Sequence, residues 1–503
     1  MLQWAAMEPE TRAASSPLQE EIFPRDSSLA LGRTGRREPR PRPEWILFAL
    51  LLVCYGYFFY LGGQWAVESR MALVRAVVER GQIEVDHYVF DRLGRLRFGD
   101  VAYVPARGHY YADKGVGPAL LAIPVYAAAW HGLPALGIRD PAVVQAIGYY
   151  AVNLLCNALP AALLGVVFYR FLGFFTQNRG HRIWLTLAYG LGTIAFVYAV
   201  AFHSHQLCAV ALFFSFALLV WMRHRGWKWW AAMLAGLSAA FAAITDHPTA
   251  VVSVMLLLYA AWVARRTGPG AAARAATVVI AAAVMLVPQM LYNNHCFGGP
   301  LKFPYAFEIT PQFHAGMSRG LAGITWPQPA GIWGLTFGPR RGVFYNSPFL
   351  CFAIAGFALL FRERRWRAEA WLSLGTVVAV ILLAAAFYMW WGGAVYGGRY
   401  VVPMLPFLAF PAILAMPRAR AAFGVLAVIS IAFSTAAAAA SRVFSEDLPN
   451  PLVQGVFVNL AHRDLNFNLG MLLGLNGYAT LLPLAVIGGA LLVWLAATVQ
   501  EPT

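Results

Sequence analysis

The stretch "QLCAVALFFSFALLVWMRHRGWK", Gln206 to Lys228, decides the class of this protein. Its first seventeen residues carry no charged side chain. The basic end that follows them groups Arg, His, Arg and Lys. An apolar run of this length crosses a hydrocarbon core of roughly 30 Å as a helix. Lys and Arg collect on the cytoplasmic side of a membrane. The stretch therefore predicts a transmembrane helix that ends in the cytoplasm.

The composition of the whole chain agrees with this prediction. Of its 503 residues, 60% are hydrophobic and only 12% are charged, which is too little polar surface for a water-soluble globule. The net charge of +15 comes from Arg clusters beside apolar runs, so it indicates membrane topology and not nucleic-acid binding. The five cysteines are scattered and form neither a zinc pattern nor a disulfide framework. We expect an all-α polytopic membrane protein.

Basic clusters follow alternate apolar runs, and this alternation predicts the topology. With every cluster in the cytoplasm, about twelve spans result, near 45–63, 142–170, 183–201, 206–222, 230–246, 248–264, 275–293, 345–361, 369–389, 400–415, 421–440 and 474–497. Both termini are then cytoplasmic, in an inner (plasma) membrane. Residues 1–44 are rich in Arg, Pro, Ser and Glu, and predict a disordered basic cytoplasmic tail. The first apolar run lacks a cleavage pattern and is expected to remain as a signal anchor.

One apolar segment, Val116 to Trp130, does not fit this count. It is short, contains Pro118 and Pro124, and follows a charged pair, so we expect a juxtamembrane or re-entrant helix on the outer face. The alternative is that it spans the membrane and that 142–170 forms a hairpin.

Three long outer loops remain, near 64–141, 294–344 and 441–473, whereas the cytoplasmic connections are short. Loops of this length are usually functional, so function is expected on the outer face of the membrane domain, 45–503. The first loop begins with an expected amphipathic helix on the bilayer, in which Met71, Val74, Val77 and Val78 recur at helical spacing.

The first loop also carries a resemblance. Glu68-Ser69-Arg70, the helical stretch that ends at Glu79-Arg80-Gly81, and "YYADKGVGPALLAIPVY" from Tyr110 resemble the first outer loop of GT-C fold, lipid-phosphate-dependent glycosyltransferases. The likeness is to bacterial members similar to protein O-mannosyltransferases and to the aminoarabinose transferases. Looser likenesses are "YNNHCFGGPLKFPY", "RRGVFYNSP" and "WWGGAVYGGRYVVPMLPFL". Two positions depart from the family pattern: Val67 replaces its first acid, and Gly115-Val116-Gly117-Pro118 replaces its double proline.

The resemblance implies a set of site residues. Sugar transfer from a polyprenyl phosphate requires the same kinds of groups on chemical grounds. A carboxylate takes the acceptor's proton or binds a metal, and cations stabilise the departing phosphate. We expect Glu68 as the catalytic carboxylate, either as general base or as metal ligand, and Asp86 as the candidate replacement for the acid missing at position 67. The expected phosphate ligands are Lys114, Arg399, Arg340 and Arg341, and the expected substrate-binding residues are Arg70, Asp113 and His205.

Each of these residues also has a plain structural interpretation. Glu68 suits a helix start, Asp86 suits an Asx-turn, and Arg399 suits an aromatic belt. Asp246, in "DHP", is expected to cap the next helix. A divalent metal, Mg or Mn, remains an open option.

The sequence therefore predicts a membrane glycosyltransferase that moves a sugar from a polyprenyl-phosphate donor to a glycan, lipid or protein acceptor outside the membrane. A transporter or flippase for a lipid-linked sugar is one alternative, but it requires polar groups near the bilayer midplane. An inactive lipid-binding scaffold is the other, because Val67 stands where the family has an acid.

Overall fold

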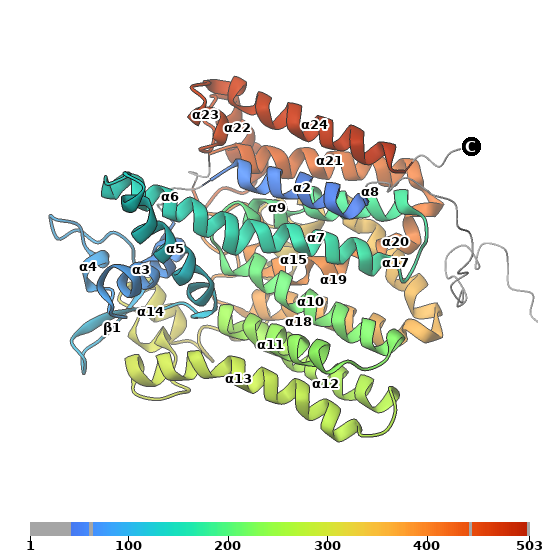
Figure 1. Cartoon of the computed structure of the whole chain (residues 1–503), viewed down its shortest axis with the longest axis horizontal. Coiled ribbons are helices and arrows are strands. Elements are labelled where there is room, and N and C mark those ends of the chain that lie inside the picture. The colour runs from blue at the N-terminus through green and yellow to red at the C-terminus, as the bar shows by residue number, and fades with distance from the viewer. Residues whose placement is uncertain (1–41, 60–63, 442–444, 500–503) are drawn as a thin grey trace, which may run out of the picture.

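The computed structural model describes residues 42–59, 64–441 and 445–499. A bundle of long helices fills most of the molecule, and a smaller layer of helices and one hairpin caps one end of it (Figure 1). The cap contains α3, α4 and β1, whereas α17 and α20 lie at the opposite end. The tail expected at 1–44 falls almost entirely outside the described residues.

Seven helices in the described part of the chain are long and apolar enough to cross a membrane. They are Pro141–Leu172 (α6 and α7), Ser204–Arg225 (α10), His247–Arg266 (α12), Ala271–Phe297 (α13), Arg364–Ala386 (α18), Arg420–Ala439 (α21) and Gly477–Ala497 (α24). An eighth results if Arg399–Ala409 and Ala412–Arg418, which are bent by 44°, form one span. The prediction of a helical, multi-span chain is confirmed, and seven or eight such helices stand against the expected twelve.

Four further apolar helices in the described chain are shorter, with 10 to 17 residues. They are Pro43–Tyr57 (α2), Trp229–Thr245 (α11), Pro348–Arg362 (including α17) and Leu452–Ala461 (including α22). Arg179–Gly192 (α8) and Ile194–Ala199 (α9) are separated by a break at Thr193. Helices α2, α8 and α11 lie among the long ones (Figure 1).

The segment 141–172 is one long helix with a local widening at Leu154–Ala158, so the alternative that it forms a hairpin is wrong. The segment before it forms α5, Gly117–Ala135, beside α3 and α6 in the cap (Figure 1). Pro118 lies in the first turn of α5, where proline is tolerated because no backbone N–H is required there.

The cap is built around α3, Trp65–Arg80, and an antiparallel hairpin of β1, Val101–Val104, and β2, His109–Ala112. Val101 pairs with Ala112 and Val104 with His109. The helix predicted here is present, but Met71 and Val74 are buried in an apolar cluster with residues of β2 and α5. Its apolar face therefore packs against protein and not against the bilayer.

The remaining described elements connect these parts. They are α4 (Asp86–Val89), η3 (Pro304–Phe307), α14 (Pro311–Met317), α15 (Pro329–Thr336), α16 (Val343–Asn346), η6 (Arg399–Met404), α19 (Leu405–Ala409), α20 (Ala412–Ala415) and α23 (Leu469–Leu472). The hairpin gains a third neighbour where Ala102 bridges to Glu308, directly after η3.

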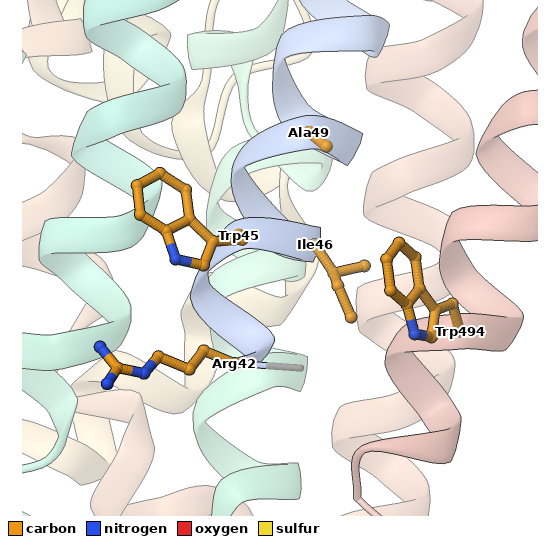
Figure 2. Close-up of a pocket in the computed structure, with 5 residues that line it drawn as sticks. All are labelled: Arg42, Trp45, Ile46, Ala49 and Trp494. Atoms are coloured by element: carbon orange, nitrogen blue, oxygen red, sulfur yellow. The ribbon is translucent and has the colours of Figure 1, made fainter. Parts of the chain in front are cut away.

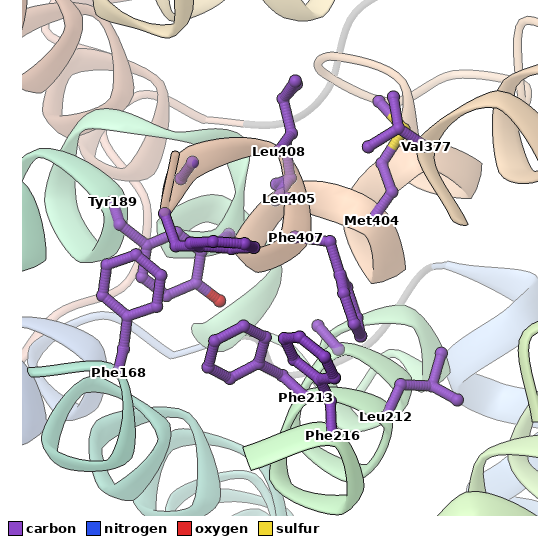
Figure 3. Close-up of a cluster of buried hydrophobic side chains, with 14 of the residues drawn as sticks. Phe168, Tyr189, Leu212, Phe213, Phe216, Val377, Met404, Leu405, Phe407 and Leu408 are labelled. Atoms are coloured by element: carbon purple, nitrogen blue, oxygen red, sulfur yellow. The ribbon is translucent and has the colours of Figure 1, made fainter. Parts of the chain in front are cut away.

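Aromatic side chains in contact with one another hold the centre of the bundle together. Phe168 of α7 lies against Tyr189 of α8, with ring centroids 4.7 Å apart, and Phe213 and Phe216 of α10 each lie 5.3 Å from Phe407 of α19 (Figure 3). Close van der Waals packing is the main attraction between helices in lipid. These contacts fix the bundle on which the outer cap is seated.

Candidate active site

Lys114 follows β2 directly and lies between two carboxylates. Its Nζ forms an ion pair with Asp113 and lies 3.2 Å from the Asp100 carboxylate. Asp113 is completely buried and also accepts a 2.8 Å hydrogen bond from the Ser69 hydroxyl of α3. Burial disfavours the Lys114 charge, but the two carboxylates outweigh it and raise the pKa of Lys114. The stretch that the sequence singled out is thus a buried charged site.

The backbone around Lys114 is anchored to α13. The Tyr292 hydroxyl donates to the Ala112 carbonyl at 2.9 Å, and the Val116 N–H donates to the Gln289 side chain at 3.0 Å. Lys114 is therefore fixed by contacts on both sides, within the cap and against the membrane bundle.

Glu308 joins this group from the segment between α13 and α14. Its carboxyl lies in hydrogen-bonding contact with Asp113 and is buried, and its Oε2 has no hydrogen-bond partner among the described residues. Burial and the neighbouring Asp113 raise the pKa of Glu308 to about 11, whereas Lys114 and Ser69 hold the pKa of Asp113 below its ordinary value despite burial. These opposite shifts favour the protonated form of Glu308 beside an ionised Asp113.

Arg70 extends the site from α3 to the membrane helices. It is buried, and its guanidinium donates to the Ser204 hydroxyl at 2.9 Å and to the Ala66 carbonyl at 2.6 Å. Its Nε has no partner among the described residues. Burial lowers the pKa of Arg70, but Asp246 and Asp113 oppose this shift, so its charge faces acids on two sides.

His205 and Asp246 form a second acid–base pair beside Arg70. The His205 Nδ1 lies 2.9 Å from an Asp246 carboxylate oxygen, and both side chains are largely buried. The Asp246 side chain makes no capping hydrogen bond to the following helix, so the expectation of a simple cap is wrong. The carboxylate instead binds the imidazole that lies across the gap between α10 and α11.

Arg399 completes the group at the start of η6. It donates to the Tyr400 hydroxyl at 3.0 Å, its guanidinium lies 5.0 Å from the centre of the Tyr400 ring, and its Nε has no partner among the described residues. The Tyr400 ring in turn contacts the His205 ring edge-on, with centroids 5.5 Å apart. Arg399 also interacts electrostatically with Arg70 and Asp100.

These residues form one charged cluster at the end of the bundle that meets the cap. We call it the charged cluster and define it as Arg70, Asp100, Asp113, Lys114, His205, Asp246, Glu308 and Arg399. Five of the residues predicted from the sequence are thus brought together: Arg70, Asp113, Lys114, His205 and Arg399.

Arg340 and Arg341 have different contacts. Arg341 is completely buried and donates to the carbonyls of Trp391, Gly393 and Arg340 at 2.6 to 3.0 Å. Arg340 donates to the Glu446 carbonyl at 2.7 Å and lies over the Trp391 ring. The Arg341 guanidinium therefore holds the loop at 390–393 in place. The Arg340 guanidinium joins this region to the segment that contains Glu446.

Glu68 lies on α3 and is partly buried. It interacts electrostatically with Tyr149 of α6. Its neighbour Val67 is buried against Met71 and Tyr149 and lines a cavity of about 10 Å³, which is room for one water molecule. The side chain at position 67 therefore packs among mainly apolar neighbours.

Asp86 stands at the start of α4. Its carboxylate accepts from the Tyr110 N–H at 3.2 Å and lies 3.3 Å from His109 Nδ1, and it is about one third exposed. These contacts tie the end of α4 to the hairpin. Its catalytic role stays a prediction.

The sequence analysis missed Glu308 and misjudged Asp246. One signal was available for Glu308, because it is the single acidic residue between positions 294 and 344. A single acid in a long loop whose other charged residues are all basic is a candidate for a buried or functional carboxylate. No local pattern revealed that Asp246 faces His205.

Two further observations concern ligands. A cavity of about 160 Å³ lies between α2 and α24 and is lined by Arg42, Trp45, Ile46, Ala49 and Trp494 (Figure 2). Its lining contains no carboxylate and no residue of the charged cluster.

Among the residues that the structure describes, no group of three or more His, Cys, Asp or Glu side chains is arranged to hold a metal ion.

Comparisons with known proteins give a structural likeness. No family model matches the chain, and no curated protein matches it. The fold is similar to that of ArnT from Cupriavidus metallidurans in the apo state, with a TM-score of 0.49, 14% identity, and 91% of this chain and 75% of that chain covered. The same protein bound to undecaprenyl phosphate gives a TM-score of 0.48, with 14% identity and coverage of 91% and 76%.

Proposed function

We propose that this protein is a membrane glycosyltransferase that moves a sugar from a polyprenyl-phosphate donor to an acceptor on the outer face of the membrane. The observation that carries the proposal is the charged cluster itself. Three cations and four acids are gathered there with a histidine, at the end of the bundle where the apolar helices meet the cap. Such a site suits a lipid phosphate whose tail stays in the hydrocarbon region.

The arrangement of charges supports the chemistry of phosphate departure. Arg70 and Arg399 each present a buried Nε without a partner in the described chain, and Lys114 is partly exposed. Guanidinium groups bind phosphate oxygens through several parallel hydrogen bonds, and fixed cations stabilise the charge that develops on a leaving phosphate. Lys114 would share its charge between the phosphate and its two carboxylates.

The resemblance of the first outer loop to GT-C enzymes supports the same reaction. On this basis we propose the finer topology of about twelve spans, with both termini in the cytoplasm and the cap outside. Glu68 and Asp86 remain the proposed carboxylates of the first loop, and Arg340 and Arg341 the proposed second set of phosphate ligands.

The distribution of charge favours surface chemistry over transport. Every Asp, Glu, Lys and Arg of the seven membrane-length helices lies within the first or last two turns, as with Arg223 and Glu369, which pair at the end opposite the cap. A transporter needs polar groups near the bilayer midplane. The described helices of this length carry none of these charges there.

The test is sugar transfer in reconstituted membranes given a panel of polyprenyl-phosphate sugars, comparing wild type with Lys114→Ala and Glu68→Gln. We expect wild type to consume one donor and both variants to lose turnover while still folding. If wild type consumes no donor of the panel but moves a lipid-linked sugar between leaflets, the protein is a transporter and the proposal is wrong.

A further inference from the structure

The charged cluster contains more acids than its reaction requires, and their contacts separate their roles. Asp100 and Asp113 are both occupied by Lys114, and Asp113 also by Ser69. Glu308 keeps its proton beside Asp113. None of these three carboxyl groups is well placed to take a further proton from an acceptor.

His205 differs from them in one respect. The Asp246 carboxylate lies 2.9 Å from its Nδ1, so the Nδ1–H donates to Asp246 and the Nε2 carries the lone pair. This is how a carboxylate orients a histidine that acts as a base, since it fixes both the tautomer and the direction of the ring. Asp246 comes from the junction of α11 and η2 and His205 from the first turn of α10, so two membrane helices hold the pair.

Cations flank this pair on both sides. Arg70 binds the hydroxyl of Ser204, the residue next to His205, and Arg399 lies over the ring of Tyr400, which contacts the His205 ring. Both guanidinium groups have a buried Nε without a partner in the described part of the chain. A base and two phosphate-binding groups thus lie within a few side chains of one another.

We propose that His205, oriented by Asp246, is the base that accepts the proton of the acceptor hydroxyl. This inference rests on the proposed glycosyl transfer. It gives the site a base that does not depend on the acid missing at position 67.

The step balances as follows. The acceptor O–H proton moves to His205 Nε2 while the acceptor oxygen forms a bond to the anomeric carbon. The bond from that carbon to the phosphate oxygen breaks, and its electron pair stays on the phosphate, which Arg70 and Arg399 hold. The His205 proton then passes to water, so no oxidant, reductant or further co-reactant is needed.

The first test compares wild type with His205→Gln in the donor panel described above, under conditions where both keep the same unfolding temperature. Removal of a general base typically costs about 10²- to 10⁴-fold in rate. We expect a loss of this size in the turnover of His205→Gln, with unchanged affinity for a polyprenyl phosphate that carries no sugar. His295→Gln is the matched control, because His295 lies 3.9 Å from Glu84 in an exposed pair outside the cluster.

The second test is the pH profile of turnover. The titratable and charged groups that face His205 are Asp246, Arg70, Arg399, Tyr400, Tyr198 and His203. Wild-type turnover should fall at acidic pH as His205 takes up a proton, and this fall should be absent from the residual activity of a His205→Ala variant. Added imidazole should restore part of the turnover of His205→Ala, which loss of a purely structural side chain does not predict.

Asp246 is a positioning residue, and its variant gives a separate readout. Asp246→Asn should lower turnover with unchanged affinity for the polyprenyl phosphate, because the amide favours the wrong tautomer of His205. If wild type transfers sugar and His205→Gln does so at the same rate, the inference is overturned and the proposed function stands. If wild type transfers no sugar from any donor, both are overturned.

Discussion

Gly115 lies so close to Ile244 that a β-carbon at position 115 would be 2.3 Å from the Ile244 carbonyl oxygen. Two residues on, a β-carbon at Gly117 would be 2.2 Å from the Thr245 hydroxyl. Both contacts lie next to Asp246, at the end of α11. The two glycines after Lys114 therefore allow the cap to dock against the end of α11, next to Asp246. This docking brings Lys114 and the other cap residues of the charged cluster together with those on the helices of the bundle.

Replacing Gly115 with Ala should push the cap away from α11. Overpacking of this kind costs about 1 to 3 kcal/mol, so we expect a lower unfolding temperature and weaker binding of polyprenyl phosphate. Gly132→Ala is the matched control, because no atom lies within 4 Å of a β-carbon there. Gly132 is in α5, the helix that begins two residues after Gly115, and its replacement should leave stability unchanged or slightly raised. Equal unfolding temperatures for the two variants would contradict the docking role of Gly115.

Glu308 should make the stability of the protein depend on pH. Burial and Asp113 raise its pKa from 4.5 to about 11 in the folded protein, so the folded chain keeps a proton that the unfolded chain releases. The stabilising effect is full below pH 4.5 and is lost as the pH rises toward 11. Between pH 5.5 and 9, a one-proton difference changes the free energy of unfolding by about 1.4 kcal/mol per pH unit at most.

Glu308→Gln, which cannot ionise, should therefore gain stability relative to wild type as the pH rises. The measurement is the unfolding temperature of both proteins in detergent at pH 5.5 and pH 9, with Glu363→Gln as the control at the opposite end of the bundle. A constant difference between wild type and Glu308→Gln at the two pH values would show that Glu308 is already ionised at neutral pH.

Arg341 should act as a structural brace. It binds the carbonyls of Trp391 and Gly393, and each of these groups would lose its partner in Arg341→Ala. An unpaired buried polar group costs about 1 to 3 kcal/mol, so we expect a clearly lower unfolding temperature. Arg319→Ala, at an exposed site, should have no such effect.

The same pair of variants tests the other role proposed for Arg341. Loss of polyprenyl-phosphate affinity in Arg341→Ala at an unchanged unfolding temperature would favour a phosphate ligand. Burial lowers the pKa of Arg341 to about 10, so the side chain stays charged at neutral pH in either role.

Much of the fold followed from local patterns. Apolar runs such as 206–222 and 275–293 form helices of membrane length, because each run must satisfy its own backbone hydrogen bonds in lipid. The helix at the start of the first outer loop also followed from its spacing. The sequence could not show that its apolar face is covered by α5, since an apolar stripe suits a protein neighbour as well as a bilayer.

The candidate site followed from the sequence only in part. Lys114 and Asp113 are adjacent and lie in a motif, so the sequence by itself determined that a charged pair stands before an apolar helix. Only the tertiary structure decided what that pair meets. Glu308 reaches Asp113 because its backbone forms an isolated bridge to Ala102, and His205 reaches Asp246 across 41 residues because α10 and α11 are neighbours. Such contacts depend on how helices and strands pack, and no local spacing in the sequence encodes them.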